Sequence, residues 1–344
     1  MKIFLNAVRC AVERNEGQWQ CCHIRMDTLI DTGENCTSAV EIPSLLPLLS
    51  VIIPTRNRAR SLKLLLESLA EPARIGIPET EIIVVDNGST DETRRWLDAR
   101  REQNQSGRLI ILDEPRTGKS NAINRALMVA RGEIFMILDD DVVVEPNCLA
   151  KHAEAHAQNQ FAAIQGRILP GKDFVGNTAD AKRLREYNIP LIDYGEEIVA
   201  IRGLTGTNMS FKRAVFDKIG FFDHRLGPGA AGFSEDTEYS IRIRKAGFKI
   251  GYTPHAIVYH ELNPSRYGRV YNRAVEYRKG VSRSLYRRDS ILTKVLPDLF
   301  ANCIRYGIYR LFGRHDKVYK TEGRILKSWG YLAGRLGRGA GPVV

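Results

Sequence analysis

The sequence lacks the apolar run of roughly 18 residues that a membrane-spanning helix requires. The apolar stretch near its start, within residues 1–9, is also too short for the central region of a signal peptide. These two absences argue against a helical membrane protein and favour the cytoplasm as the location of the chain.

Cysteine is sparse and is not spaced for zinc. The chain contains no pair of cysteines in the Cys-x2-Cys spacing that most structural zinc sites use. His23 lies among the first four cysteines, but without that spacing we disfavour a zinc site. We interpret the cysteines as reduced, partly buried thiols. They are Cys10, Cys21, Cys22, Cys36, Cys148 and Cys303.

Charged residues are plentiful but unevenly distributed. The 344 residues carry a formal net charge of +11. Residues 261–344 contain 18 Lys and Arg against 6 Asp and Glu, whereas residues 1–260 contain 33 against 34. A hydrophobic share of 43% is that of a folded protein. We therefore expect an anionic partner for the C-terminal end alone.

Hydrophobic periodicity predicts alternating strands and helices. Short runs rich in Ile, Val and Leu are typical of buried strands, and the amphipathic segments between them are typical of helices. We expect strands at 48–54, 81–85, 109–112 and 134–138, and helices at 60–69, 92–101 and 120–131. This order predicts an α/β fold with a mostly parallel sheet flanked by helices.

Polar segments follow three of these predicted strands, at residues 54–58, 86–91 and 139–141. Ligands of parallel sheets bind beyond the carboxyl ends of the strands, so we expect these segments to converge on one edge. Residues 88–91 have the composition of a turn and helix cap. Asp86 lies at the strand tip, where its carboxylate could accept a hydrogen bond from a nucleobase N–H.

Three consecutive carboxylates, Asp139, Asp140 and Asp141, end the apolar run 134–138. Adjacent like charges raise one another's pKa and destabilise the fold unless a cation is present. A divalent cation with oxygen ligands is the natural partner, and Mg²⁺ usually brings substrate phosphates with it. The alternative is an acidic turn that is simply solvated.

Three further polar features carry alternatives of their own. Gly118-Lys119-Ser120 is not a P-loop, because position 113 is Asp where that motif needs Gly, but Lys119 could still lie near a diphosphate. The acids of 234–238 either stabilise a helix start or include a general base. His260 is either a third metal ligand or an ordinary core or surface histidine.

These segments, taken in order, resemble the family 2 glycosyltransferases with the GT-A nucleotide-diphospho-sugar fold. Each motif is weak alone, but their order is specific, and the resemblance spans about residues 48–266. The matching segments are 50–58, 83–91, 118–124, 138–142, 206–211, 234–238 and 258–260.

The resemblance implies a role for each matched residue. The nucleotide-sugar donor would be bound by Pro54, Thr55, Asn57, Asp86, Asn87, Lys119, Asp139 and Asp140. A divalent cation, Mn²⁺ or Mg²⁺, would be held by Asp141, Asp139 and His260. Asp236 would be the catalytic base, supported by Glu235. The acceptor side of the sugar would be lined by Gly206, Thr207 and Asn208.

The reaction implied by the resemblance is metal-dependent, inverting transfer of a sugar to a hydroxyl of a glycan or lipid-linked acceptor, in cell-surface polysaccharide or glycolipid assembly. The chain has no Gln-x-x-Arg-Trp element of the processive synthases, which favours transfer of a single sugar. The alternative is a non-catalytic sugar-nucleotide-binding or assembly protein of the same fold. A nucleotidyltransferase is disfavoured, because residues 54–58 lack the Gly-rich loop of that class.

This interpretation divides the chain into three parts. Residues 1–46, which show no clear period, would be an N-terminal extension of unknown role. Residues 47–265 would be the GT-A catalytic domain, with a nucleotide-binding half (47–145) and an acceptor half (146–265). Residues 266–344 would be a basic helical tail.

Apolar residues recur at three-to-four spacing through 291–312 of this tail, which predicts an amphipathic helix. Such a helix either lies on an anionic membrane surface, through residues 285–344 at the inner face of the cell membrane, or packs on the catalytic domain with its charges solvated. The tail contains no recognisable nucleic-acid-binding module, so no nucleic-acid partner is expected.

Overall fold

The computed structural model describes residues 9–14, 18–23, 49–70, 79–103, 108–171, 191–261 and 268–337. The chain forms two compact units, residues 1–44 and 45–344, and each is described by itself. In the first unit, strands β1 (Arg9–Arg14) and β2 (Gln18–His23) pair antiparallel, with Cys10 opposite Cys22. The predicted extension therefore contains a short hairpin, while Cys36 lies outside the described residues.

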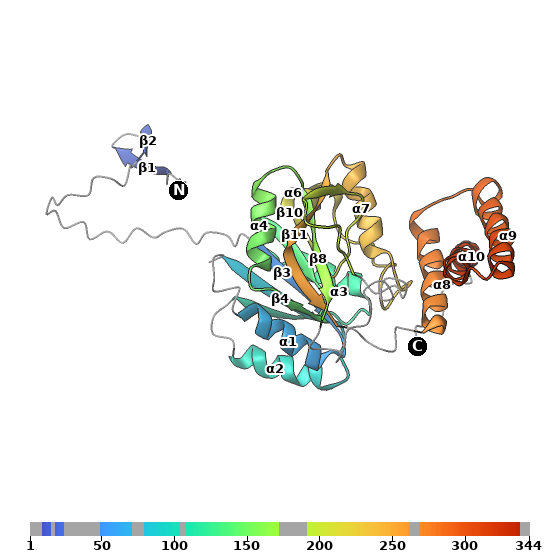
Figure 1. Ribbon diagram of the computed structural model, residues 1–344. Coiled ribbons are helices and arrows are strands. Elements are labelled where there is room, and N and C mark those ends of the chain that lie inside the picture. The colour runs from blue at the N-terminus through green and yellow to red at the C-terminus, as the bar shows by residue number, and fades with distance from the viewer. Residues whose placement is uncertain are drawn as a thin grey trace. The chain divides into compact units, whose positions relative to one another are not determined.

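The first half of the larger unit is a four-stranded parallel sheet in the order β5-β4-β3-β6. Figure 1 labels its neighbouring strands β3 and β4. All four strands coincide with the predicted runs to within a residue or two. They are β3 (Leu49–Thr55), β4 (Thr80–Asp86), β5 (Leu109–Asp113) and β6 (Ile134–Leu138). The α/β, mostly parallel fold is confirmed in this half.

The second half continues the same sheet with mixed strand directions. Strand β10 (Asn208–Lys212) runs antiparallel between β6 and β8 (Ala163–Pro170), and β11 (Ile250–His260) runs parallel to β8. The short strands β7 (Val142–Val144) and β9 (Val199–Ile201) pair antiparallel with β11. Pairing of β7 with β11 brings the segment after Leu138 beside His260.

Helices cover both faces of the sheet, as the apolar strands predict. On one face, α1 (Ala59–Ala70) and α4 (Cys148–Ala157) share a core with Val51 and Ile53 of β3. On the other face, Ile52 shares a core with α3 (Lys119–Leu127), α6 (Arg213–Ile219) and α7 (Glu235–Lys245). Within the described residues, helix α2 (Glu92–Gln103) lies between β4 and β5 in the chain. Adjacent residues of one strand thus belong to two different cores, because successive side chains point to opposite faces of the sheet.

Helix α3 is shorter than the predicted 120–131. It ends at Leu127, and the chain turns toward β6 instead of continuing the helix. The backbone N–H of Arg131 donates to the Glu81 carboxylate (2.6 Å), and Arg213 donates to the carbonyl oxygen of Ala130 (3.0 Å). These tertiary hydrogen bonds favour the turn over further helix.

The C-terminal part consists of α8 (Arg269–Tyr286), a π-helical turn η2 (Ile291–Val295), α9 (Leu296–Leu311) and α10 (His315–Arg335). Added methyl groups at Gly280 and Gly330 would collide with backbone carbonyls of the opposite helix, so α8 and α10 pack backbone to backbone. The predicted amphipathic helix of the tail is present, as η2 followed by α9. None of the helices in the described ranges is both long enough and apolar enough to span a bilayer.

The two cysteines described with their side chains differ in environment. Cys148 is buried in the core and Cys303 lies on the exposed face of α9, and neither forms a disulfide. Burial raises the pKa of the Cys148 thiol. Our prediction of a partly buried thiol at Cys303 is wrong, because the apolar face of α9 points to solvent.

Candidate active site

Hydrogen bonds connect the polar segments that follow β3, β4 and β6. Thr55 Oγ1 donates to the Asp140 carboxylate (2.7 Å), which ties the end of β3 to the end of β6. The side-chain oxygen of Asn57 accepts from the backbone N–H of Thr90 (2.7 Å), which ties the same segment to the loop after β4. The three segments therefore meet at one edge of the sheet, as expected.

Several of the predicted donor-binding residues shape this edge through their own hydrogen bonds. Asn87 donates to the carbonyl oxygens of Glu114 and Arg116 (2.9 and 2.8 Å) and accepts from the N–H of Gly118 (2.8 Å), so it holds the loop before α3. Asn57 adopts a positive φ of 54°, which asparagine tolerates well. Pro54 is buried within β3.

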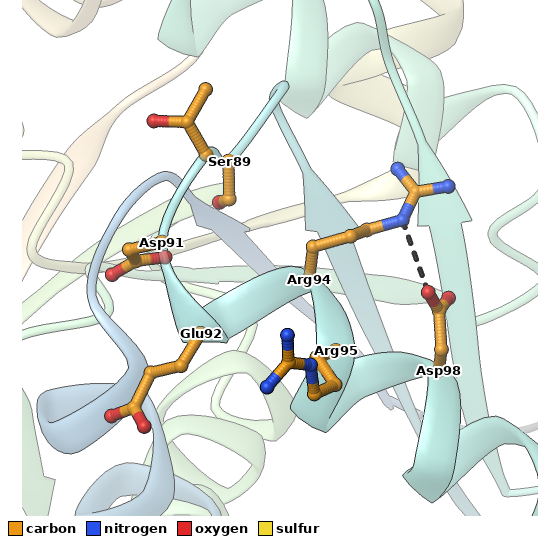
Figure 2. Close-up of a pocket in the computed structure, with 7 residues that line it drawn as sticks. Ser89, Asp91, Glu92, Arg94, Arg95 and Asp98 are labelled. Atoms are coloured by element: carbon orange, nitrogen blue, oxygen red, sulfur yellow. Dashed lines mark hydrogen bonds and ion pairs between the residues drawn. The ribbon is translucent and has the colours of Figure 1, made fainter.

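Asp86 is fully buried at the tip of β4. It accepts from the N–H of Ser89 (3.0 Å) and lies 3.4 Å from the Arg94 guanidinium. Arg94 also pairs with Asp98 (3.4 Å) and Asp113 (3.0 Å), and Figure 2 shows its side chain reaching toward Asp98. One guanidinium thus links α2 to the ends of β4 and β5.

An open hollow of about 730 Å³ lies beside this arginine (Figure 2). Its lining comes from the loop after β4 and the first turns of α2, within residues 89–98. The hollow therefore adjoins Asp86 and Arg94 but is separate from the three consecutive carboxylates.

Lys119 lies between two acidic residues, Asp139 after β6 and Glu235 at the start of α7. Its ammonium contacts the Asp139 carboxylate and lies 3.6 Å from Glu235 Oε1. Burial opposes the charged form of Lys119, but Asp139 and Glu235 outweigh it and raise the pKa. The acidic residues around positions 140 and 236 therefore lie close together, with the Lys119 ammonium between Asp139 and Glu235.

The loop before β10 contacts acidic residues on both sides of Lys119. Thr207 Oγ1 donates to Asp139 (2.7 Å), and the backbone N–H of Gly206 donates to Asp236 (3.3 Å). A methyl group at Gly206 would lie 3.0 Å from Lys119 Nζ, so the backbone approaches the lysine closely. Gly206 and Thr207 thus contact both acidic groups, and their placement on the acceptor side of the sugar stays a prediction.

Three carboxyl groups of the site have raised pKa values. Burial raises the pKa of Asp140 to about 7, and the neighbouring Asp141 acts in the same direction. Burial, followed by Asp236, raises the pKa of Glu235 to about 7. Burial also raises the pKa of Asp236. Clustered, strongly shifted acids in one place indicate a functional site more often than a structural one.

Asp141 and His260 form a donor pair that fits a divalent cation. His260 Nδ1 lies 2.7 Å from the carbonyl oxygen of Glu261, so in the neutral imidazole Nδ1 carries the proton and Nε2 points its lone pair at Asp141 Oδ1, 3.3 Å away. Metal-binding histidines commonly donate their second N–H to a carbonyl in this way. Across the described residues no three His, Cys, Asp or Glu side chains cluster as a metal site.

The sequence comparisons agree with this geometry. The model of Glycosyl transferase family 2 matches residues 50–220. The chain belongs to this family.

Two relatives illustrate the range of the family. The probable glycosyltransferase YdaM of Bacillus subtilis is 26% identical over 227 residues, covering 63% of this chain and 51% of the relative. The poly-beta-1,6-N-acetyl-D-glucosamine synthase of Staphylococcus epidermidis is 26% identical over 238 residues, covering 67% of this chain and 55% of the relative. The chain thus spans about half the length of these relatives.

A solved structure confirms the GT-A-like fold. The mannosyltransferase PcManGT from Pyrobaculum calidifontis, in complex with GDP-Man and Mn²⁺, superimposes with a TM-score of 0.52 at 21% identity. The match covers 87% of this chain and 77% of that chain.

One matched residue of this family 2 chain does not join the site. Asn208 is fully buried, and its amide donates to the carbonyl oxygens of Arg167 and Ala256 (3.1 and 3.0 Å) while its oxygen contacts His152 Nε2 (2.9 Å). Its side chain therefore binds β8, β11 and α4 rather than the space around Lys119.

Three residues that the sequence analysis did not select also support the site. Arg58 lies 3.6 Å from Asp141 and 3.5 Å from Glu261, so it joins the third carboxylate to the residue after His260. Arg58 ends the matched segment 50–58 and Glu261 directly follows the matched segment 258–260, so both could have been found there. Gln165 accepts from the N–H of Thr205 (2.6 Å) and fixes the loop before β10, but nothing in its local sequence marks it.

Helix α8 contacts the loop that precedes Asp236. Ser282 Oγ donates to the carbonyl oxygen of Ala231 (3.2 Å), and the Tyr286 hydroxyl is hydrogen-bonded to Ser234. Ser234 has a positive φ of 77°, a strained conformation that surrounding contacts must hold. The basic tail thus begins with a helix that supports the predicted catalytic loop.

Proposed function

We propose that this chain is an inverting glycosyltransferase that moves one sugar from a nucleotide-diphospho-sugar to an acceptor hydroxyl. The observation that carries the proposal is the position of Lys119, which lies between Asp139 and Glu235 and so joins the two acidic groups in one site. Family membership and the GT-A-like fold support the same reaction class.

The donor is proposed to occupy the edge formed by the ends of β3, β4 and β6. Lys119 would change partners from Asp139 to the diphosphate, since a lysine held by two carboxylates can be taken over by a more highly charged anion. Thr55, Asn57, Asp86, Asn87, Asp139 and Asp140 would position the nucleotide, either directly or by holding its loops.

Asp141 and His260, with Asp139 nearby, would hold a Mn²⁺ or Mg²⁺ ion at this edge. When bound, such an ion neutralises charge that develops on the leaving diphosphate. The support from the chain itself is the orientation of His260, whose Nε2 faces a carboxylate across 3.3 Å and would be stabilised by a cation between them.

Asp236 is proposed as the base that takes the proton of the acceptor hydroxyl. Direct displacement at the anomeric carbon needs one base on the opposite face of the sugar. Burial raises the pKa of Asp236, which makes its carboxylate a stronger base, while Gly206 and Thr237 orient it through hydrogen bonds of 3.3 and 2.6 Å. Glu235 supports it, and Gly206 and Thr207 would line the acceptor side.

The acceptor is proposed to be a glycan or lipid-linked molecule in cell-surface polysaccharide or glycolipid assembly. A relative named as a poly-beta-1,6-N-acetyl-D-glucosamine synthase supports this setting. The outward apolar face of η2 and α9, which exposes Leu292, Phe300 and Leu311, supports peripheral attachment to an anionic membrane at its inner face.

A two-part assay tests the proposed function. A thermal-shift screen of nucleotide sugars, with and without Mn²⁺, should identify one donor whose stabilisation depends on the ion. Turnover of that donor should then release the nucleoside diphosphate, and faster with acceptor extract. Donor binding without any release, in the presence of metal and acceptor, would favour the alternative of a non-catalytic sugar-nucleotide-binding protein.

A further inference from the structure

The C-terminal helices enclose a second candidate ligand site, apart from the edge of the sheet. A pocket of about 270 Å³ lies where α8, η2, α9 and α10 converge. Its lining is strongly basic, with two carboxylates against five cations. The cations are Arg283, Lys294, Arg305, Arg324 and Lys327.

One carboxylate of this pocket, Asp289, already has three cationic partners. Asp289 accepts from Arg283 (2.8 Å), Arg287 (2.9 Å) and Lys294 (2.9 Å). Although burial opposes it, these hydrogen bonds lower the pKa of Asp289 to about 2. Asp289 therefore remains ionised and occupied at any physiological pH.

The other three cations make no ion pair with any residue of the described ranges. Lys327 is half-buried, and Arg305 and Arg324 are exposed at the rim. Burial lowers the pKa of Lys327, and the neighbouring cations Lys279 and Arg283 act in the same direction against Glu276. Like charges held together without a counter-charge destabilise the fold, and an anion between them would relieve this.

A polar atom inside the same pocket also lacks a partner. Asn302 is only 7% exposed, and its amide donates to the carbonyl oxygen of Asp298 (2.6 Å). This bond orients the side-chain oxygen, which has no hydrogen-bond partner although it is buried. A buried carbonyl oxygen needs a donor, and a ligand hydroxyl would supply one.

We propose that this pocket binds a phosphate ester that also carries a hydroxyl, with Lys327, Arg305 and Arg324 on the phosphate and Asn302 accepting from the hydroxyl. Two sources share this chemistry: the glycerol phosphate headgroup of an anionic lipid and a free phosphate ester in solution. The site is independent of the proposed glycosyl transfer, because none of its residues contacts the donor edge.

Titration calorimetry on the full chain tests this site, with sn-glycerol 3-phosphate and dispersed dihexanoyl-phosphatidylglycerol as probes and chloride of equal ionic strength as reference. Lys327→Met should weaken binding of at least one probe by about tenfold or more, since one charged hydrogen bond is lost. Lys320→Met is the matched control, because it removes the same charge from an exposed position on α10 outside the pocket.

A second pair of variants keeps the test independent of folding. Arg305→Gln alters an exposed rim residue of α9 and should also weaken binding, while Arg310→Gln on the same helix should not. Binding of the lipid probe alone would identify a headgroup, and equal binding of both probes would identify a free ester. Unchanged affinity in Lys327→Met overturns the proposal, and this result is expected if the phosphate binds only at Lys119. No binding beyond the chloride reference also overturns it.

Discussion

At the edge of the sheet, carboxyl groups outnumber cations, whereas among the helices from Arg269 to Arg335 cations outnumber carboxyl groups. Around Lys119 the excess negative charge raises the pKa values of buried acids. Around Asp289, Arg283 and Lys294 pair with this one carboxylate, while other cations of the pocket have no carboxylate partner among the described residues. Each region therefore carries charge of one sign that its own residues do not neutralise, and a ligand of the opposite sign would stabilise it.

The largest expected effect in this comparison is on turnover. Asp236→Asn keeps the size of the side chain and one of its two accepted backbone hydrogen bonds but removes the base, so kcat should fall by about 10²- to 10⁴-fold. Release of nucleoside diphosphate measures this, and donor binding by calorimetry should stay within a few-fold of wild type. Near-normal turnover would remove Asp236 from the mechanism.

Asp141→Asn should abolish transfer. It should also weaken donor binding when the divalent ion is present, but not when the ion is absent. The carboxylate is proposed to hold that ion together with His260, so its loss removes the contact between ion and donor. Calorimetry of the identified donor, with Mn²⁺ and with chelator, separates the two conditions. Normal metal-dependent affinity in this variant would refute the metal assignment.

Substitutions at two adjacent residues of α9 should have different effects, one on stability and the other on membrane binding. Leu299 is buried, so Leu299→Ala should lower the free energy of unfolding by about 2–3 kcal/mol. Phe300 is 70% exposed, so Phe300→Ser should change stability by less than about 0.5 kcal/mol but reduce flotation with anionic liposomes. Full-length protein that never floats with anionic lipid would exclude the membrane role.

The last effect concerns the pH dependence of stability. The folded pKa of Glu235, about 7, lies above its unfolded value of 4.5, so the folded state binds more protons between these pH values. Stability should therefore fall as the pH rises from about 4.5 to 7, by about 2 kcal/mol, and this fall should be smaller in Glu235→Gln.

Urea unfolding at several pH values measures the Glu235 effect. Glu92→Gln, at an exposed position in the first turn of α2, is the matched control and should follow wild type. Parallel pH profiles for wild type and Glu235→Gln would contradict the environment described for this residue.

The parallel strands were predictable because each is a short apolar run, buried throughout in β3 and β6 and partly buried in the edge strand β5. Strand β6 matches its predicted bounds of 134–138. The hairpin β1–β2 was not predicted, since residues 1–46 have no clear period. Helix α3 is shorter than expected, because Glu81 and Arg213 lie far away in sequence and their hydrogen bonds cannot be seen in a local pattern.

The site was predictable as a set of motifs but not residue by residue. Thr207 and Asn208 belong to one motif, yet Thr207 contacts Asp139 while Asn208 is buried among β8, β11 and α4. Consecutive residues at the start of a strand point to opposite sides, and a motif does not say which side faces the ligand. Likewise, the position of Lys119 between two acids depends on the tertiary contacts that bring Asp139 and Glu235 to it, not on its own sequence neighbours.

The contact between glycines of α8 and α10 has a mechanical consequence. Because Gly280 and Gly330 let the two backbones touch, α8 and α10 must shift together rather than slide past each other. Ser282 and Tyr286 of α8 hold the strained loop at Ser234, two residues before Asp236. A displacement of α10 would therefore move α8 with it and shift the backbone that positions Asp236, the proposed base.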